Sequence, residues 1–332
     1  MPPNNQTNDK LPDIIKSDEN VKNEDKTDDK WKCLDHIIWT NVLYFIGLLL
    51  AAIYGAYLVF TDAKILTTLF GVFLYHISLF GITAGVHRLW SHRSYKAKLP
   101  FRIILAICNS ISYQNSIYEW GRDHRVHHKF TETDADPVNS LRGFFFSHCG
   151  WLMCRKHPDV KRIGGKVDLS DMLADPVVYY QKEYYMPSVV VLCFVMPTLI
   201  PWYLWSETLW NAFFVCVMLR YMAGINSTWL VNSAAHMYGY KPYDVNIAPV
   251  ENISISALTL GEGYHNFHHT FPWDYSTSEW GWNINLTTFI LDQLAKIGWV
   301  YDRRFVTKDM IEKRKARTGP KADKYIPHEH EY

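Results

Sequence analysis

Four long apolar stretches separate the polar regions of this chain. Residues 37–60 carry no charged side chain, and residues 65–86 are interrupted by His76. Each stretch exceeds the about 20 apolar residues that cross the hydrocarbon core of a bilayer. Because only residues 61–64 lie between them, the pattern predicts two membrane-spanning helices joined in a tight hairpin.

A second, less regular pair of apolar stretches follows at residues 188–205 and 211–235. Pro197 and Pro201 interrupt the first of these and Arg220 the second. Their lengths and the short connection between them predict a second hairpin of spanning helices. The chain therefore reads as an all-α integral membrane protein with four transmembrane helices.

One more apolar stretch, residues 99–118, is interrupted by polar side chains at Arg102, Asn109 and Gln114. Such a mixed pattern is typical of a helix that lies at the membrane surface or inside the protein. We therefore expect no fifth span here.

Lysine and arginine residues set the expected orientation. Residues 87–187 contain 15 of them and residues 236–332 contain 11, whereas the short turns within the two hairpins contain only Lys64. Because positively charged loops stay in the cytosol, we expect a multi-pass protein with both termini cytosolic.

The ends of the chain differ in composition from its middle. Residues 1–36 are rich in Lys, acidic residues and Asn, which predicts a disordered cytosolic tail without a cleaved signal peptide. The remaining chain divides into one domain, residues 37–304, and a cytosolic C-terminal tail, residues 305–332. Within the domain we expect a cytosolic helical cap formed by residues 87–187 and 236–304.

Composition narrows the class of protein further. A formal net charge of +1 argues against nucleic acid as a partner, since nucleic-acid binders carry a basic excess. The 13 Trp and 21 Tyr suit the two interfaces of a membrane. The six Cys form no CxxC pair, which predicts neither a disulfide framework nor a zinc knuckle and fits a reducing compartment.

The strongest chemical signal is histidine. Of 15 His, eight fall in the clusters HRLWSH, HRVHH and HNFHH, namely His87, His92, His124, His127, His128, His265, His268 and His269. On a helix, the HxxHH spacing places three imidazoles on one face. The five-residue spacing in HRLWSH requires a helix end or a loop to converge. Eight imidazoles can fill the shells of two ions, and imidazole suits iron, copper, zinc or nickel.

Other metal motifs are missing from the sequence. The sequence has a single ExxH pair, Glu262 and His265, whereas a carboxylate-bridged di-iron bundle needs two. Without HExxH the common zinc-protease helix is excluded. Three acids near the clusters, Glu119, Asp123 and Glu262, either orient imidazoles or form ordinary salt bridges with arginines.

These clusters lie in longer motifs that closely resemble one family. TAGVHRLWSHRSYKAKLP, EWGRDHRVHHKFTETDADP, RGFFFSHCGWL, RKHP, WLVNSAAHMYGYKPYD and GEGYHNFHHTFPWDY resemble the membrane acyl-CoA desaturases of the animal stearoyl-CoA type. The resemblance runs from Trp39 to Arg304. It implies four transmembrane helices under a cytosolic cap that holds two iron ions on nine histidines. The ninth matches His236, and Asn232 matches a residue that reaches iron through water.

The resemblance also implies a binding site for a fatty acyl-CoA. The residues that match contacts to the CoA portion are Asn41, Asn115, Arg122, Asp123, Arg155 and Lys156. Those that match the kink of the acyl tunnel are Gln114, Trp120, Thr228 and Trp229. Tyr75 matches the closed end of the tunnel, and at 1.5 Å per residue it lies about 18 Å before His87 on the same helix.

The implied reaction is O2-dependent insertion of a cis double bond. The family takes electrons from cytochrome b5 and NADH-cytochrome b5 reductase and resides in the endoplasmic reticulum membrane. The segment 248–251 resembles the NPVE variant of delta-9 enzymes except at Ala248. We therefore expect delta-9 desaturation of C16 and C18 chains, with a delta-11 or otherwise shifted pheromone-type enzyme as the nearest alternative.

Three other classes compete with this interpretation. A membrane hydroxylase would use the same iron chemistry, and only the family resemblance separates the two. A metal transporter needs ionisable residues along its membrane path, and the spans offer mainly His76 and Arg220. A bis-histidine haem protein would have a Soret band, which a non-haem iron site lacks.

Overall fold

Four long helices carry the apolar stretches. In the computed structural model, which describes residues 32–320, the helices long and apolar enough to cross a membrane are Trp39–Thr61, Ile65–Ser91, Tyr185–Trp205 and Leu209–Met237. This confirms the expected all-α membrane architecture with four spans. The second and fourth helices run past their predicted ends at residues 86 and 235, so the polar residues beyond the apolar stretches remain helical.

The first hairpin consists of α1 (Trp39–Thr61) and α2 (Ile65–Phe80), and α2 continues without a break as the π-helix η2 (Gly81–Ser91). A short 3₁₀ turn, η1 (Cys33–His36), precedes it. Gly81 allows η2 to approach the next helix closely, since a Cβ there would lie 2.4 Å from the Asn109 nitrogen.

Seven consecutive helical pieces form the second hairpin. In chain order they are α9 (Tyr185–Val189), the π-helix η6 (Val190–Val195), α10 (Met196–Trp205), α11 (Leu209–Ala212), the π-helix η7 (Phe213–Leu219), α12 (Arg220–Asn232) and α13 (Ala234–Met237). Arg220 is buried, and its guanidinium donates to the backbone oxygens of Ile111, Cys193 and Cys216. Backbone carbonyl oxygens thus accept hydrogen bonds from the positively charged Arg220 side chain inside the membrane-spanning region.

Glu207 joins the turns of the two hairpins. Its carboxylate accepts hydrogen bonds from the Lys64 backbone N–H at 2.8 Å and from the Thr67 hydroxyl at 2.6 Å, both in the first hairpin. It also accepts from Thr208 N–H and the Asn211 side chain, at the start of α11. One buried carboxylate therefore satisfies donors at the beginning of two different spans.

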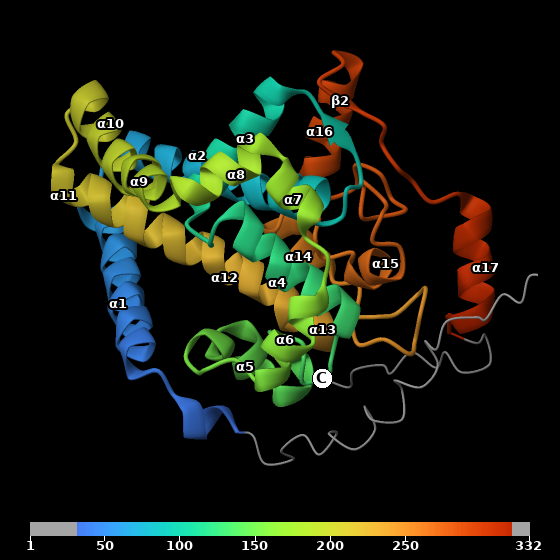
Figure 1. Cartoon of the computed structure of the whole chain (residues 1–332). Helices are drawn as coiled ribbons and strands as arrows, with labels where there is room; N and C mark the ends of the chain where they lie inside the picture. Colours follow the sequence, from blue (N-terminus) through green and yellow to red (C-terminus); the bar gives the residue numbers. More distant parts are fainter. Residues whose placement is uncertain (1–31, 321–332) are drawn as a thin grey trace, which may run out of the picture.

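The remaining elements are short and surround one end of the spans. Between the hairpins lie β1 (Lys96–Ala97), α3 (Leu99–Ser112), α4 (Ile117–Phe130), η3 (Ser140–Arg142), α5 (Phe144–His148), η4 (Gly150–Leu152), α6 (Pro158–Arg162), η5 (Gly164–Lys166), α7 (Ser170–Ala174) and α8 (Pro176–Glu183). After the second hairpin come α14 (Ile253–Leu258), α15 (His265–Thr270), α16 (Leu286–Lys296), β2 (Val300–Tyr301) and α17 (Lys308–Thr318). In Figure 1 the α10–α11 turn lies at the far left, and α4, α13 and α15 lie at the centre and right.

The apolar stretch 99–118 is not a span. Its helix, α3, ends at Ser112, where Tyr113 takes a left-handed conformation and turns the chain toward α4. Ile103 and Ile107 are exposed on one side of α3, while Leu105 and Asn109 are buried on the other. This two-sided pattern confirms the interpretation of a non-spanning helix.

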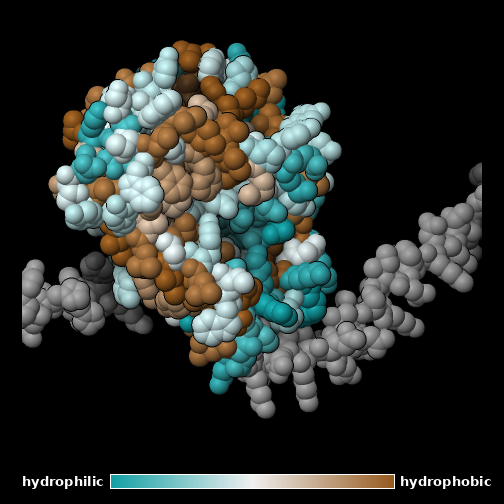
Figure 2. Space-filling model, turned by 90° about the vertical axis from the view of Figure 1, so that its left-hand side faces the viewer, coloured by the Kyte–Doolittle hydropathy of each residue, from teal (hydrophilic) through white to brown (hydrophobic). Residues whose placement is uncertain are grey.

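Surface hydropathy agrees with the arrangement of the spans. Figure 2 shows that hydrophobic side chains cover much of the face on the side of α1, α10 and α11, whereas hydrophilic side chains gather along its lower right side. An exposed apolar surface of this extent indicates contact with lipid rather than with water.

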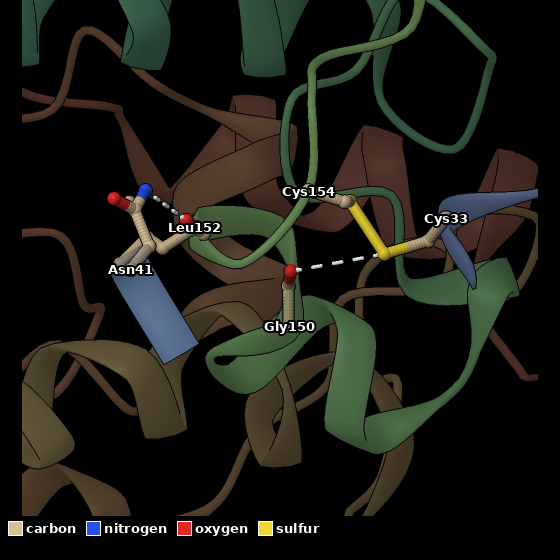
Figure 3. Close-up of a disulfide and its surroundings, with 5 residues drawn as sticks. All are labelled: Cys33, Asn41, Gly150, Leu152 and Cys154. Carbon is tan, nitrogen blue, oxygen red and sulfur yellow. Dashed lines mark hydrogen bonds between the residues drawn. A yellow bond between two sulfur atoms is a disulfide. The ribbon is translucent and has the colours of Figure 1, made fainter. Parts of the chain in front are cut away.

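A disulfide joins Cys33, just before α1, to Cys154 in the loop after η4 (Figure 3). The expectation of unpaired cysteines is wrong for these two. They lie 121 residues apart, so only the folded chain brings them together. The other four, Cys108, Cys149, Cys193 and Cys216, are free thiols.

Candidate functional site

Nine histidines converge into two groups. One contains His87, His92, His124, His128 and His268, and the other contains His127, His236, His265 and His269. Within each group, one nitrogen from every ring lies within 4.8 Å of the others. The nine histidines named from the sequence therefore all meet, as two adjacent sets of possible metal ligands.

The nitrogen-to-nitrogen distances fit ions better than hydrogen bonds. His268 Nε2 lies 2.9 Å from His87 Nε2 and 3.0 Å from His128 Nε2, and one ring N–H cannot point at both. His265 Nε2 likewise lies 3.1 Å from both His236 Nε2 and His269 Nε2. Nitrogens bound at about 2.1 Å to one ion at right angles lie about 3 Å apart.

His127 supplies a further sign of a metal site. Its Nε2 is buried and has no hydrogen-bond partner among residues 32–320, whereas its Nδ1 lies 2.9 Å from the Asp136 carboxylate. A ring that donates its Nδ1 proton to a carboxylate keeps a free lone pair on Nε2. The residues present therefore fit two metal ions.

Local structure explains how each cluster converges. In α4 the HxxHH spacing places His124, His127 and His128 on neighbouring positions of one helical turn. The short helix α15 does the same for the HNFHH cluster. His87 and His92 converge at a helix end, as expected, since His92 caps the C-terminus of η2. They lie one π-turn apart, and the His92 N–H donates to the His87 carbonyl at 3.1 Å.

Carboxylates hold the outer nitrogens of three rings. Glu262 Oε2 lies 2.9 Å from His87 Nδ1, Asp136 lies beside His127, and Glu132 lies 3.3 Å from His236 Nδ1. Of these acids, the sequence singled out only Glu262 as a candidate. Asp136 and Glu132 could have been suspected from the acidic run that follows HRVHH.

The other two suspected acids do not contact the histidine groups. Glu119 forms a capping box with Ser116 at the start of α4. Asp123 forms ion pairs with Arg122 and Lys156. For these acids the salt-bridge or structural alternative is the correct one.

Burial favours the neutral form of six of the imidazoles. It lowers the pKa well below 6.5 for the ligand candidates outside the spans, namely His92, His124, His128, His265, His268 and His269. Burial alone would raise the pKa of Glu262, but Arg88 and His87 outweigh it and lower that pKa to about 2. The neutral imidazole is the form in which histidine binds a metal.

Histidines of both groups line two cavities. The first encloses about 220 Å³ between α1, α4, α12 and the η4 turn, and the second about 40 Å³ near η2 and α14. Both are lined by Trp120, His124, His127, Thr228 and Asn232. These five residues form a common wall, so the two cavities adjoin each other beside the metal groups.

The substrate-binding residues predicted from the sequence differ in whether they line the first cavity. Those that line the first cavity are Gln114, Asn115, Trp120, Asp123, Thr228 and Trp229. Asn41 donates to the carbonyl of Leu152, which also lines it, and Lys156 and Arg122 pair with Asp123. Arg155 directly precedes Lys156 in the same loop. Tyr75 lines neither cavity, and its hydroxyl bonds to Ser227 Oγ and the Leu258 carbonyl, both at 2.8 Å.

Comparison with known proteins agrees with this geometry. The family model for fatty acid desaturases matches residues 63–296. The chain belongs to the fatty acid desaturase family. This desaturase is 57% identical over 284 residues to "Acyl-CoA Delta-9 desaturase" of Acheta domesticus, covering 85% of the chain and 79% of the relative. It is 58% identical to "Acyl-CoA Delta12-desaturase" of the same species, covering 85% and 80%, and 56% identical to human "Stearoyl-CoA desaturase", covering 85% and 78%.

Family membership and geometry support each other at the metal groups. Residues 63–296, which match the family model, include all nine histidines and the five residues that line both cavities. The four candidate spans and the buried imidazoles are what a membrane desaturase requires of its fold. The recognition made from the motifs is therefore confirmed.

Proposed function

We propose that this protein is an acyl-CoA desaturase, an oxidoreductase that introduces a cis double bond into a saturated fatty acyl-CoA. The observation that carries the proposal is the pair of adjoining cavities whose common wall includes His124 and His127. An acyl chain that passes through both cavities would lie against both groups of histidines. Relatives named as acyl-CoA and stearoyl-CoA desaturases support the substrate class.

Two iron ions are the proposed cofactor, with O2 as co-substrate. The first group of five histidines would hold one ion, and the second group of four would hold the other, with Asn232 as a water-mediated ligand. Bound iron supplies, with O2, an oxidant strong enough for an unactivated methylene, which no side chain provides. The protein positions the chain and excludes water.

Different side chains in and around the first cavity would bind the acyl chain and the CoA portion of the substrate. Trp120, Thr228 and Trp229 offer an apolar, bent passage for the acyl chain, with Gln114 beside it. The CoA portion would contact Asn41, Asn115, Arg122, Asp123, Arg155 and Lys156, because Arg and Lys suit phosphate. Tyr75 would limit chain length from beyond the second cavity, through its bonds to Ser227 and Leu258.

We propose the delta-9 position and C16 or C18 chains. The segment 248–251 and the delta-9 and stearoyl-CoA names among the relatives favour this position. A second candidate is a shifted position such as delta-11, favoured by the relative named for delta-12 at 58% identity. Insertion of a hydroxyl group is a third, less supported outcome.

Electron supply and location are part of the same proposal. Cytochrome b5 and NADH-cytochrome b5 reductase would reduce the iron, and the protein would lie in the endoplasmic reticulum membrane with both termini cytosolic. The charge bias of residues 87–187 and 236–332 supports that orientation. The desaturase domain would extend over residues 37–304.

Expression in yeast that lacks its own acyl-CoA desaturase tests the function. Mass spectrometry of the cellular lipids should find delta-9 C16 and C18 monoenes, and His127→Ala should abolish them. His76→Ala is the matched control, because His76 is an exposed histidine of α2 outside both groups and should leave the products unchanged.

Each result has a different meaning. Double bonds at another carbon would keep the desaturase and reject the delta-9 assignment. Hydroxylated chains would replace desaturation by hydroxylation. No new lipid from folded, iron-loaded protein supplied with a cytochrome b5 system would overturn the proposed substrate.

A further inference from the structure

A short segment before the first span lies along the loop that borders the first cavity. We call residues 33–38 the strap and residues 150–156 the mouth loop. Cys33 of the strap is disulfide-bonded to Cys154 of the mouth loop, and their Cα atoms are 5.6 Å apart, within the usual range for a disulfide (Figure 3).

Backbone hydrogen bonds continue the contact on both sides of Cys154. Ile38 N–H donates to the Met153 carbonyl at 2.8 Å, and Arg155 N–H donates to the His36 carbonyl at 3.0 Å. These bonds form an isolated antiparallel bridge between strap and mouth loop. The strap therefore fixes the backbone next to Arg155.

The strap is bonded to a loop that lines the first cavity and leads directly into a helix that also lines it. Trp151 and Leu152 of the mouth loop line it, as do Tyr44 and Phe45 of α1, which follows the strap directly. Asn41 also links α1 to the mouth loop, because its side chain donates to the Leu152 carbonyl at 2.7 Å (Figure 3). The disulfide thus joins the segment before α1 covalently to the mouth loop, and both segments adjoin residues that line the cavity.

The two sulfurs differ in access. Cys154 is 4% exposed, whereas Cys33 is half-buried at the outer side of the pair. A thiol can therefore reach Cys33 first. In a reducing compartment such a disulfide is transient and regulatory rather than permanent.

We propose that Cys33 and Cys154 form a reversible thiol-modification site that controls the affinity of the first cavity for acyl-CoA. The inference rests on the proposed function, in which this cavity binds acyl-CoA and opens to the cytosol. A small dithiol, or two monothiols, delivers two electrons and two protons. The Cys33–Cys154 bond breaks, two thiols form, and the reductant leaves as its own disulfide.

Reduction releases the strap and loosens the opening. The mouth loop then has to be ordered when substrate binds, so the Kd of stearoyl-CoA rises by about three- to tenfold. Turnover at saturating substrate stays the same, because neither cysteine contacts a histidine group. Oxidation by a small disulfide such as oxidised glutathione restores tight binding.

The test uses the full chain, iron-loaded and in nanodiscs without an electron donor, so that bound stearoyl-CoA is not consumed. Samples are equilibrated with oxidised glutathione or with dithiothreitol. Alkylation and mass spectrometry report the state of Cys33 and Cys154, and equilibrium dialysis reports the Kd of stearoyl-CoA. Cys33→Ser removes the more accessible cysteine of the pair, so the disulfide cannot form. Cys149→Ser is the matched control, because Cys149 is a free thiol next to the mouth loop.

The expected result is a higher Kd after reduction in the wild type and in Cys149→Ser, and a high, redox-independent Kd in Cys33→Ser. Equal Kd values in two states that alkylation shows to interconvert would overturn the inference, as would a pair that never oxidises. Absence of stearoyl-CoA binding in every sample would instead overturn the proposed function, and this inference with it.

Discussion

Carboxylates next to the outer ring nitrogens orient three of the histidines in the metal groups. Glu262 is the clearest case, because one oxygen accepts from Arg88 Nη2 at 2.8 Å and the other lies 2.9 Å from His87 Nδ1. Burial would favour its neutral form, yet the two partners hold its pKa at about 2. An ionised carboxylate at this position fixes the His87 tautomer and leaves Nε2 free for a metal.

Substitution of Glu262 should weaken metal binding without removing a ligand. Glu262→Gln keeps the shape and loses the charge, so we expect the affinity for iron to fall by about 10–100-fold. Iron retained against a chelator series, measured by mass spectrometry of the metal, gives the affinity. Glu312→Gln on the exposed side of α17 is the control, and equal retention in both variants would contradict the role of Glu262.

Glu251 should make stability depend on pH. Burial raises its pKa to about 8, and one of its oxygens accepts from Phe267 N–H. Between its ordinary value near 4.5 and pH 8, the folded state holds a proton that the unfolded state has lost. The free energy of unfolding therefore falls as pH rises through this window.

Glu251→Gln keeps the shape and cannot ionise. We expect the Tm of this variant to exceed that of the wild type at pH 8.5, and the difference to shrink at pH 6. Thermal unfolding in one detergent at both pH values measures it. A difference that does not change with pH would show that Glu251 is not neutral in the folded protein.

At the scale of elements, the π-helix η2 decides the metal geometry. An α-helix would place His87 and His92 about 140° apart, whereas the i→i+5 bond between them brings both rings to one group. The same continuation carries Arg88, which is fully buried and binds Glu262. The end of the second span is thus part of the site.

The junction at Glu207 should matter for stability rather than for chemistry. Glu207→Ala leaves donors at the start of α2 and α11 without their acceptor, and we expect a loss of about 2–4 kcal/mol in the free energy of unfolding. The Tm in detergent measures this loss. Glu183→Ala, at an exposed position ending α8, should leave the Tm unchanged, and equal Tm values would refute the role of the junction.

At the scale of the whole molecule, the metal groups connect distant segments. Their ligands come from η2 and its C-cap, α4, α13 and α15, which lie far apart in the chain. Of these, α4, α13 and α15 lie at the centre and right of Figure 1. Bound ions would therefore hold both hairpins to the surrounding helices. Ligands that bind only the folded state stabilise it in proportion to their affinity.

Removal of metal should destabilise the whole protein. At an ion concentration of 100 times Kd, binding contributes about 2.7 kcal/mol, so chelation should lower the Tm by about 5–10 °C. Differential scanning fluorimetry before chelation, after it, and after addition of ferrous iron measures this change. A Tm that does not respond to chelator would contradict a metal shared between these helices.

The sequence alone determined the spans, the non-spanning helix and the nine imidazoles. Apolar length predicts a span because a bilayer demands about 20 apolar residues regardless of neighbours. The HxxHH spacing predicts convergence because helix geometry is local. These features depend on residues close together in the chain, and so the motifs sufficed to recognise the family.

Only the tertiary structure decided which residues meet across long separations. It assigned His127 to the second group and its neighbour His128 to the first, and it placed Asp136 and Glu132 behind the rings. It gave the helix end at His92 the form of a π-turn and paired Cys33 with Cys154. The physical reason is that such contacts depend on how packed helices approach each other, which the order of residues along one helix does not specify.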